Sequence, residues 1–127
     1  MVLGGHIDSW DVGQGAQDDG TGMVLCMEAA HLIQRLGLKP RRTIRVVLWT
    51  NEENGSRGAH GYKEAHRAEW ANHVAAIESD IGNGLARGFD LDLRPKLGTP
   101  ADSSRAAEVD SLESAAKALG LARVRAL

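Results

Sequence analysis

The segment Thr43–Thr50 (TIRVVLWT) most limits the fold that this chain can adopt. It is rich in β-branched residues and nearly all apolar in its second half, which is typical of a strand buried on both faces of a sheet. An amphipathic stretch precedes it, and further short apolar segments lie at Val2–Ile7 and Val74–Ile77. Alternating strands and helices indicate an α/β fold. We therefore expect a partial, mostly parallel sheet with flanking helices.

Two stretches have the periodicity of helices that cover such a sheet. In Thr21–Leu36, which Gly37 is expected to end, helical spacing predicts a core-facing stripe made of Leu25, Ala29, Leu32 and Leu36. In Ser103–Leu119 the corresponding stripe is Val109, Leu112, Ala116 and Leu119. Between them, the polar, glycine-rich stretch Asn51–Gly61 is expected to be a loop and Tyr62–Trp70 to be helical.

The end of the chain continues the pattern less clearly. Gly88–Leu93 alternates apolar and charged residues and could be an edge strand, Pro95–Pro100 is expected to be a loop, and Leu121–Leu127 resembles part of a strand. The first strand begins almost at the first residue, and a strand needs neighbours. We therefore expect residues 1–127 to be part of a larger domain, with strands before them and a further region after them.

Composition narrows the classes of function. The formal net charge is -2 and no basic stripe is present, so nucleic acid is not an expected partner. No apolar run approaches the roughly 18 residues of a membrane span, and the N-terminus lacks the regions of a secretory signal. Cys26 is the only cysteine, so a metal site would have to use histidine and carboxylates. The compartment and the oligomeric state stay open.

Polar clusters follow three of the expected strands. His6 and Asp8 come at the end of the first, Glu52-Glu53 directly after Thr50, and Asp80 after the third, while Asp18-Asp19 precedes the first helix. In open α/β sheets, ligands gather at the carboxyl ends of the strands. The clusters are therefore expected to converge at one edge of the sheet.

These residue types suit a metal-dependent hydrolase. An imidazole and several carboxylates provide the donors that zinc prefers, a carboxylate can bridge two metals, and a further carboxylate can take a proton from water. Each cluster also has a plainer interpretation. Asp18-Asp19-Gly20 could be a turn that caps a helix, Glu52-Glu53 could be a solvated loop pair, and Glu78 competes with Asp80 as the third carboxylate.

Three segments carry a family resemblance: HIDSWDVGQGAQDDG, VLWTNEENGSRGA and IESDIG. Together they resemble the zinc-dependent peptidase family of carboxypeptidase Q and the bacterial two-zinc aminopeptidases, and most closely its carboxypeptidase Q branch. The resemblance implies a cis Asp18-Asp19 peptide bond and close backbone approach at Gly20 and Gly22. It also implies roles for side chains. Glu52 is the general base, and the zinc ligands are His6, Asp18 (bridging), Glu53 and Asp80. Asp8 and Asp19 contact the ligands and not the metal, and so hold the ligands in place.

The resemblance implies an exopeptidase that hydrolyses peptides or dipeptides with two zinc ions, in a family whose members are often secreted or periplasmic. Residues 1–127 would then be part of its catalytic domain. The family completes its second zinc with a histidine farther along the chain, and none of the other histidines occupies that position: His31, His60, His66 and His73. A truncated remnant that binds zinc weakly or serves as an interaction module is the alternative.

A nucleotide-binding α/β domain is a third hypothesis. It rests only on four glycines of the first loop and helix start: Gly13, Gly15, Gly20 and Gly22. Neither a phosphate-binding lysine nor a GxGxxG turn accompanies them. The zinc peptidase hypothesis accounts for more of the sequence.

Overall fold

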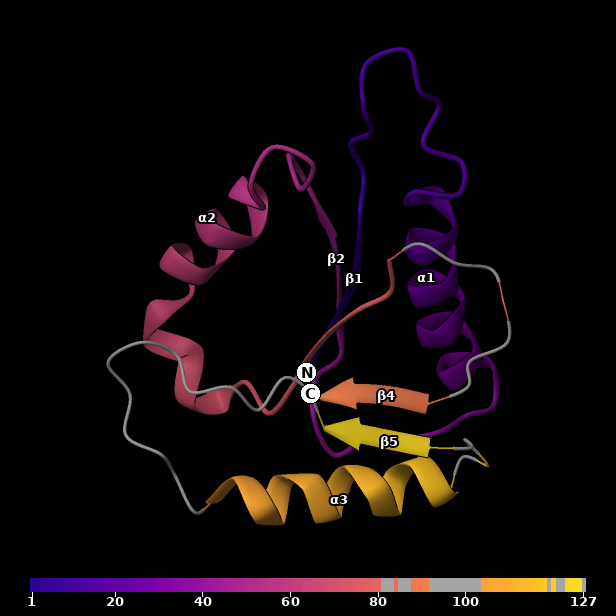
Figure 1. Cartoon of the computed structure of the whole chain (residues 1–127), viewed down its shortest axis with the longest axis vertical. Coiled ribbons are helices and arrows are strands. Elements are labelled where there is room, and N and C mark those ends of the chain that lie inside the picture. Colours follow the sequence, from indigo (N-terminus) through magenta and orange to yellow (C-terminus); the bar gives the residue numbers. More distant parts are fainter. Residues whose placement is uncertain (81–83, 85–87, 92–103, 119, 121–122, 127) are drawn as a thin grey trace. The chain divides into compact units, whose positions relative to one another are not determined.

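The structure is a computed structural model of the whole chain and describes residues 1–80, 84, 88–91, 104–118, 120 and 123–126 (Figure 1). Contacts divide the chain into two compact units, Met1–Asn83 and Gly84–Leu127. Each unit is described separately below.

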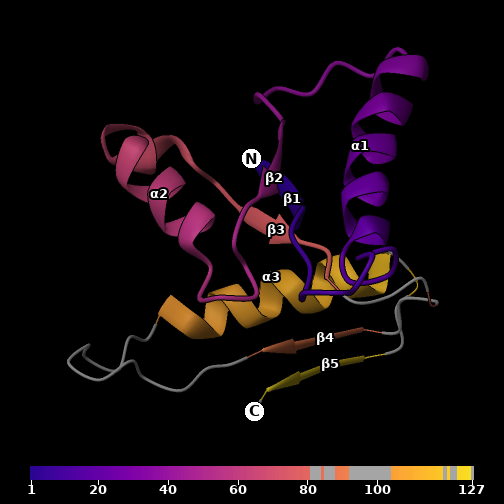
Figure 2. The same ribbon diagram turned by 90° about the horizontal axis from the view of Figure 1, so that it is seen from above.

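The first unit is built on a three-stranded parallel sheet in the order β2-β1-β3. Its strands are β1 (Val2–His6), β2 (Arg45–Trp49) and β3 (Ala76–Glu78). Val2 pairs with both Arg45 and Ala76, and His6 pairs with Trp49. Figure 2 shows the three strands side by side, with α1 and α2 on opposite sides of the sheet. The α/β class and the parallel sheet expected from the sequence are confirmed.

Helix α1 (Gly20–Arg35) packs on the sheet through small residues. Its buried residues are Gly22 and Cys26, and the Cys26 thiol donates a hydrogen bond to the backbone carbonyl of Gly4. A Cβ on Gly5 would lie 2.7 Å from the backbone nitrogen of Met23. The backbones of β1 and α1 can therefore approach closely only because Gly5 and Gly22 carry no side chain.

The predicted core stripe of this helix was wrong. Leu25, Leu32 and Leu36 are 57%, 46% and 63% exposed, because the helix turns its small-residue side to the sheet. Helical spacing identifies the residues that share a side of a helix, and this helix carries apolar residues on more than one side. The close approach decided which side is buried. Gly37, with a φ of +66°, follows the end of the helix as expected.

The second helical segment begins earlier than the sequence indicated. Helix α2 spans Arg57–Ala65, and a 3-10 helix, η1, follows at Arg67–Asn72. The Gly58 N–H donates to the backbone carbonyl of Thr50 at 2.8 Å, and a Cβ on Gly58 would lie 2.5 Å from the same oxygen. Glycine here therefore allows the helix to start against the end of β2. The glycine-rich composition had predicted a loop instead.

Arg45, at the start of β2, ties α2 and η1 to the sheet. Its guanidinium donates to the Tyr62 hydroxyl at 3.0 Å and to the Glu69 carboxylate at 2.9 Å. The Tyr62 hydroxyl also lies 3.1 Å from Nε2 of His73. Since His73 Nδ1 donates to the backbone carbonyl of Glu69, its Nε2 is the acceptor for that hydroxyl. The network joins the start of β2 to α2 and η1, which follow it by 17 and 24 residues at these contacts.

The sheet of this unit is only thinly covered. Most of β2 is half-buried and β3 is exposed, with Ile77 51% exposed, so burial on both faces of the strand at Thr43–Thr50 was wrong for the structure described. Among the described residues, no helix is long and apolar enough to cross a membrane.

The second unit pairs β4 (Gly88–Leu91) with β5 (Arg123–Ala126) in parallel and includes α3 (Ser104–Ala118). Strands and a helix were expected in these places. Ala116 of the predicted helix stripe is buried. The side chains of Val109, Leu112 and Leu119 and the predicted loop Pro95–Pro100 lie outside the described residues.

We predict that Gly22→Ala lowers the free energy of unfolding by roughly 1–3 kcal/mol, because the added Cβ would meet the Ser79 carbonyl oxygen and the Asp19 carboxylate. Gly61→Ala is the matched control. Nothing lies within 4 Å of a Cβ there, so this helical substitution should be neutral or stabilise by about 0.5–1 kcal/mol. Urea unfolding of both variants measures the difference. Equal effects would contradict the close packing of α1 at Gly22 against Ser79 and Asp19.

Glu69 predicts a pH dependence of stability. Hydrogen bonds from Arg45 and then from His66 lower the pKa of its carboxyl. A group whose pKa is lowered on folding stabilises the protein above its ordinary pKa, near 4.5, and this contribution is lost as the pH falls through the lowered value. Between about pH 6 and pH 3, the wild type should therefore lose more stability than Glu69→Gln. Parallel losses in urea unfolding would rule out this role.

Candidate metal centre

The sequence-predicted site residues meet at the carboxyl edge of the sheet in the first unit. His6 is the last residue of β1, Glu52 and Glu53 follow β2, and Asp80 follows β3. Asp18 and Asp19 stand directly before α1, and the peptide bond between them is cis, as expected. Segments separated by up to some seventy positions in the sequence thus contribute to one place, in the manner of ligand sites in open α/β sheets.

His6 lies at the centre of this cluster. Its side chain is 1% exposed, and Nδ1 donates a hydrogen bond to the backbone carbonyl of Asp8 at 2.9 Å. A carbonyl can only accept, so Nδ1 carries a proton and Nε2 is the ring nitrogen that faces the site. Nε2 lies 2.8 Å from the Asp18 carboxylate and 3.5 Å from that of Asp80. The ring therefore presents a metal-binding nitrogen to two carboxylates.

The pKa of His6 is raised. Burial acts to lower it, but the hydrogen bonds with Asp8 and Asp18 and the charge of Asp80 outweigh burial. Of these groups, Asp18 and Asp80 lie beside Nε2, and the negative charge with which they favour a charged ring would also stabilise a cation at that nitrogen. The electrostatic surroundings therefore fit a metal as well as the donor atoms do.

Two groups of side chains have the geometry to hold an ion. One is His6, Asp18 and Glu53, and the other is His6, Asp19 and Asp80; within each group the ligand atoms lie within 4.8 Å of one another. Imidazole nitrogen and carboxylate oxygen are donors that suit zinc. The residues present therefore fit the metal that the family resemblance implies.

Asp19 is the most buried of the carboxylates, with 1% of its surface exposed. One oxygen accepts from the backbone N–H of His6 at 3.0 Å, and the other accepts from that of Gly22 at 2.9 Å. The second bond caps α1. Asp19 thus joins the end of β1 to the start of α1, which places the His6 ring beside Asp18.

Asp8 contacts both halves of the site. Its backbone carbonyl orients the His6 ring, whereas its carboxylate accepts from the backbone N–H groups of Glu52 at 2.9 Å and Glu53 at 3.3 Å. Burial acts to raise the pKa of Asp8, but these backbone hydrogen bonds outweigh it and lower the pKa. The orienting group for His6 is therefore the backbone of Asp8, and its carboxylate holds the turn that carries the two glutamates.

The two glutamates point to different neighbours. Glu53 belongs to the group with His6 and Asp18, and burial followed by the charge of Asp18 raises the pKa of its carboxyl. Glu52 lies in neither group, and its carboxylate accepts a hydrogen bond from the Ser56 hydroxyl at 3.1 Å. Sequence reasoning missed Ser56, because a serine in a polar turn carries no signal of its own.

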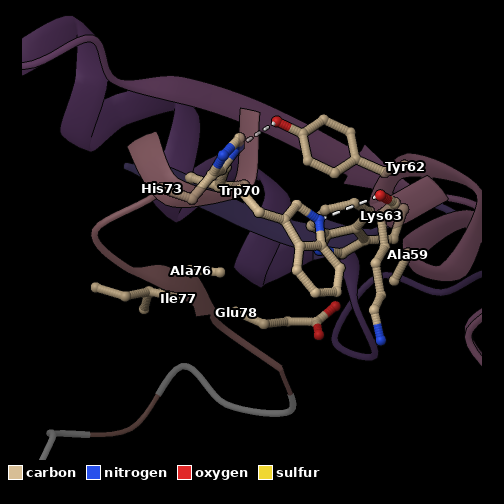
Figure 3. Close-up of a pocket in the computed structure, with 10 residues that line it drawn as sticks. Ala59, Tyr62, Lys63, Trp70, His73, Ala76, Ile77 and Glu78 are labelled. Carbon is tan, nitrogen blue, oxygen red and sulfur yellow. Dashed lines mark hydrogen bonds between the residues drawn. The ribbon is translucent and has the colours of Figure 1, made fainter. Parts of the chain in front are cut away.

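Asp80, and not Glu78, lies beside His6. Glu78 instead lines an apolar pocket of about 430 Å³ between the sheet and the α2–η1 segment, together with Trp49 and Trp70 (Figure 3). The pocket contains none of the predicted site residues. Burial, and then the charge of Asp80, raises the pKa of Glu78.

The remaining histidines of the first unit lie elsewhere. Within the described part of the chain, none of them belongs to a group with metal-binding geometry: His31, His60, His66 and His73. His66 and His73 take part in the network around Arg45, and His31 pairs with Glu28 on α1. The cluster around His6 is thus the candidate centre of the first unit.

We predict that Asp8→Asn weakens zinc binding by roughly 10–100-fold. An amide offers one acceptor where the carboxylate serves two N–H groups, so the Glu52-Glu53 turn loses part of its support. Isothermal titration with zinc measures the effect. Asp11→Asn, an exposed position of the same loop, is the control and should bind like the wild type. Wild-type affinity in Asp8→Asn would contradict the role of this carboxylate.

Comparisons with known proteins show which proteins the chain is similar to. Carboxypeptidase Q of Xenopus laevis is 48% identical over 96 residues, which cover 76% of this chain and 20% of the relative. Carboxypeptidase Q of Homo sapiens is 50% identical over 91 residues, 72% of this chain and 19% of the relative. A vacuolar membrane protease of Penicillium rubens is 32% identical over 89 residues, 70% of this chain and 9% of the relative.

The chain therefore spans about a fifth of the length of the carboxypeptidase Q relatives that it matches. No solved structure matches it significantly. The sequence model of peptidase family M28 matches residues 1–124, which is nearly the whole chain and includes every candidate site residue. The chain belongs to peptidase family M28.

Proposed function

We propose that this chain is part of the catalytic domain of an exopeptidase that uses two zinc ions. The observation that carries the proposal is the convergence of the Asp18, Glu53 and Asp80 carboxylates on one imidazole nitrogen, because histidine and carboxylates together are the donors of a catalytic zinc. Membership in family M28 supports hydrolysis of a peptide bond as the reaction. The family match runs through both compact units, which supports assigning residues 1–127 to a single partial domain.

Four side chains would hold the zinc ions: His6, Asp18, Glu53 and Asp80. Nε2 of His6 would bind one of the ions, and the Asp18 carboxylate would serve both. Asp18 and Asp80 are 43% and 42% exposed, so their oxygens remain accessible, whereas those of the buried Asp19 are engaged by backbone N–H groups. When bound, zinc supplies Lewis-acid chemistry that activates water and stabilises developing negative charge.

Glu52 is the proposed general base. It stands next to a ligand in sequence, yet lies in neither group with metal-binding geometry, so its carboxylate is available for proton transfer. It would accept a proton from the attacking water and return it to the departing amine nitrogen. The Asp8 carboxylate holds the Glu52 backbone N–H and so supports a defined position for this residue.

Peptides or dipeptides are the proposed substrates. The name carboxypeptidase Q, carried by relatives about half identical to this chain, supports cleavage at a C-terminal end. Cleavage at an N-terminal end is the alternative within the same chemistry, because both reactions use the same attack on a peptide carbonyl. The free end of the substrate would be recognised outside the metal ligands.

A second candidate is a remnant that binds zinc weakly or acts as an interaction module. It is favoured by the absence of a further histidine from the groups formed by the described residues. Zinc content per chain after dialysis distinguishes the two. About two ions per chain supports the exopeptidase, and a content near zero supports the remnant.

Glu52→Gln should lower kcat by roughly 10²–10⁴-fold and leave zinc content unchanged, because an amide cannot take up the proton. Glu64→Gln is the matched control, since Glu64 is exposed and pairs with Arg67; its kcat should equal that of the wild type. Hydrolysis of a dipeptide and zinc analysis of the same samples measure both quantities. Wild-type turnover in Glu52→Gln would show that Glu52 is not the base.

A further inference from the structure

The Glu52 side chain is folded back onto its own turn. The backbone carbonyl of Glu52 accepts from the N–H groups of Gly55 and Ser56, both at 2.9 Å. The Ser56 hydroxyl then donates to Oε1 of Glu52 at 3.1 Å. The backbone N–H of Glu52 is held separately by Asp8. Both ends of this glutamate therefore have fixed partners.

Ser56 occupies an unusual position for a serine. It precedes α2 as the N-cap residue, where a serine hydroxyl commonly accepts from the first N–H groups of the helix. Here it makes no such bond to α2. Its hydroxyl is committed to Glu52 instead.

The backbone conformation of Ser56 also suggests that its side chain is there for Glu52. Its φ is +51°, a left-handed conformation that residues with a side chain seldom adopt. Glycine would adopt it without strain, and the preceding residue, Gly55, has a φ of +97°. The side chain of Ser56 therefore has no evident use in the turn other than the contact with Glu52.

We propose that Ser56 is a positioning residue for Glu52, an inference that rests on the role proposed for Glu52 as the general base. The hydroxyl holds Oε1 and leaves Oε2 free to face the attacking water. Glutamate has several side-chain torsions to restrict, and a base must lie within hydrogen-bond reach of the proton that it takes. Ser56 would favour the side-chain arrangement in which that reach is met.

The test compares Ser56→Ala with Ser56→Gly in the zinc-loaded chain. Both variants remove the hydroxyl, but only glycine also removes the backbone strain. We expect kcat to fall about tenfold in both, with KM and zinc content unchanged. If Ser56→Gly keeps wild-type kcat, the backbone and not the hydroxyl matters, and the proposal is overturned.

Two further measurements separate this inference from the proposed function. In a Glu52→Gln background, Ser56→Ala should cause no additional loss of kcat, because the base that it positions is already gone; a further tenfold loss would contradict the proposal. In the zinc-free chain, the unfolding midpoints of Ser56→Ala, Glu52→Ala and the double variant should be non-additive. Additive midpoints would mean that the two side chains do not interact, whatever the zinc-loaded chain does.

Discussion

The buried carboxylate of Asp19 is the interaction on which the rest of the first unit depends. Burying a polar group costs free energy unless it is hydrogen-bonded, and the two oxygens of Asp19 accept from the N–H groups of His6 and Gly22. These bonds fix the start of α1 against the end of β1. The resulting distance between helix and sheet is so short that a side chain at position 5 or 22 would clash, and both positions are glycine.

The site is organised in two layers with different tasks. The inner carboxylates, those of Asp8 and Asp19, accept hydrogen bonds from backbone N–H groups. The outer carboxylates of Asp18, Glu53 and Asp80 surround Nε2 of His6 and keep accessible oxygens. The inner carboxylates hold the backbone segments that carry the outer ones, so the outer carboxylates stay close together although like charges repel. A metal ion is what such a group of outer carboxylates would stabilise.

Much of this could be predicted from the sequence. The strands were expected at nearly the positions where they occur, since short β-branched segments bounded by glycine and polar residues typically form strands. The convergence of His6 with Glu53 and Asp80 followed from the rule that side chains after parallel strands share one edge. The cis Asp18-Asp19 bond was implied by the family resemblance and is present.

Local patterns determined which residue types stand at the sheet edge, and thus the class of chemistry. The tertiary structure alone decided which side of α1 is buried, because Leu25, Leu32 and the small residues all have helical spacing and only the approach to β1 distinguishes them. It likewise decided that Asp8 orients His6 through its carbonyl and that Ser56 turns from its helix to Glu52. Such hydrogen bonds depend on the direction in which groups point, and direction is set by packing between segments distant in sequence.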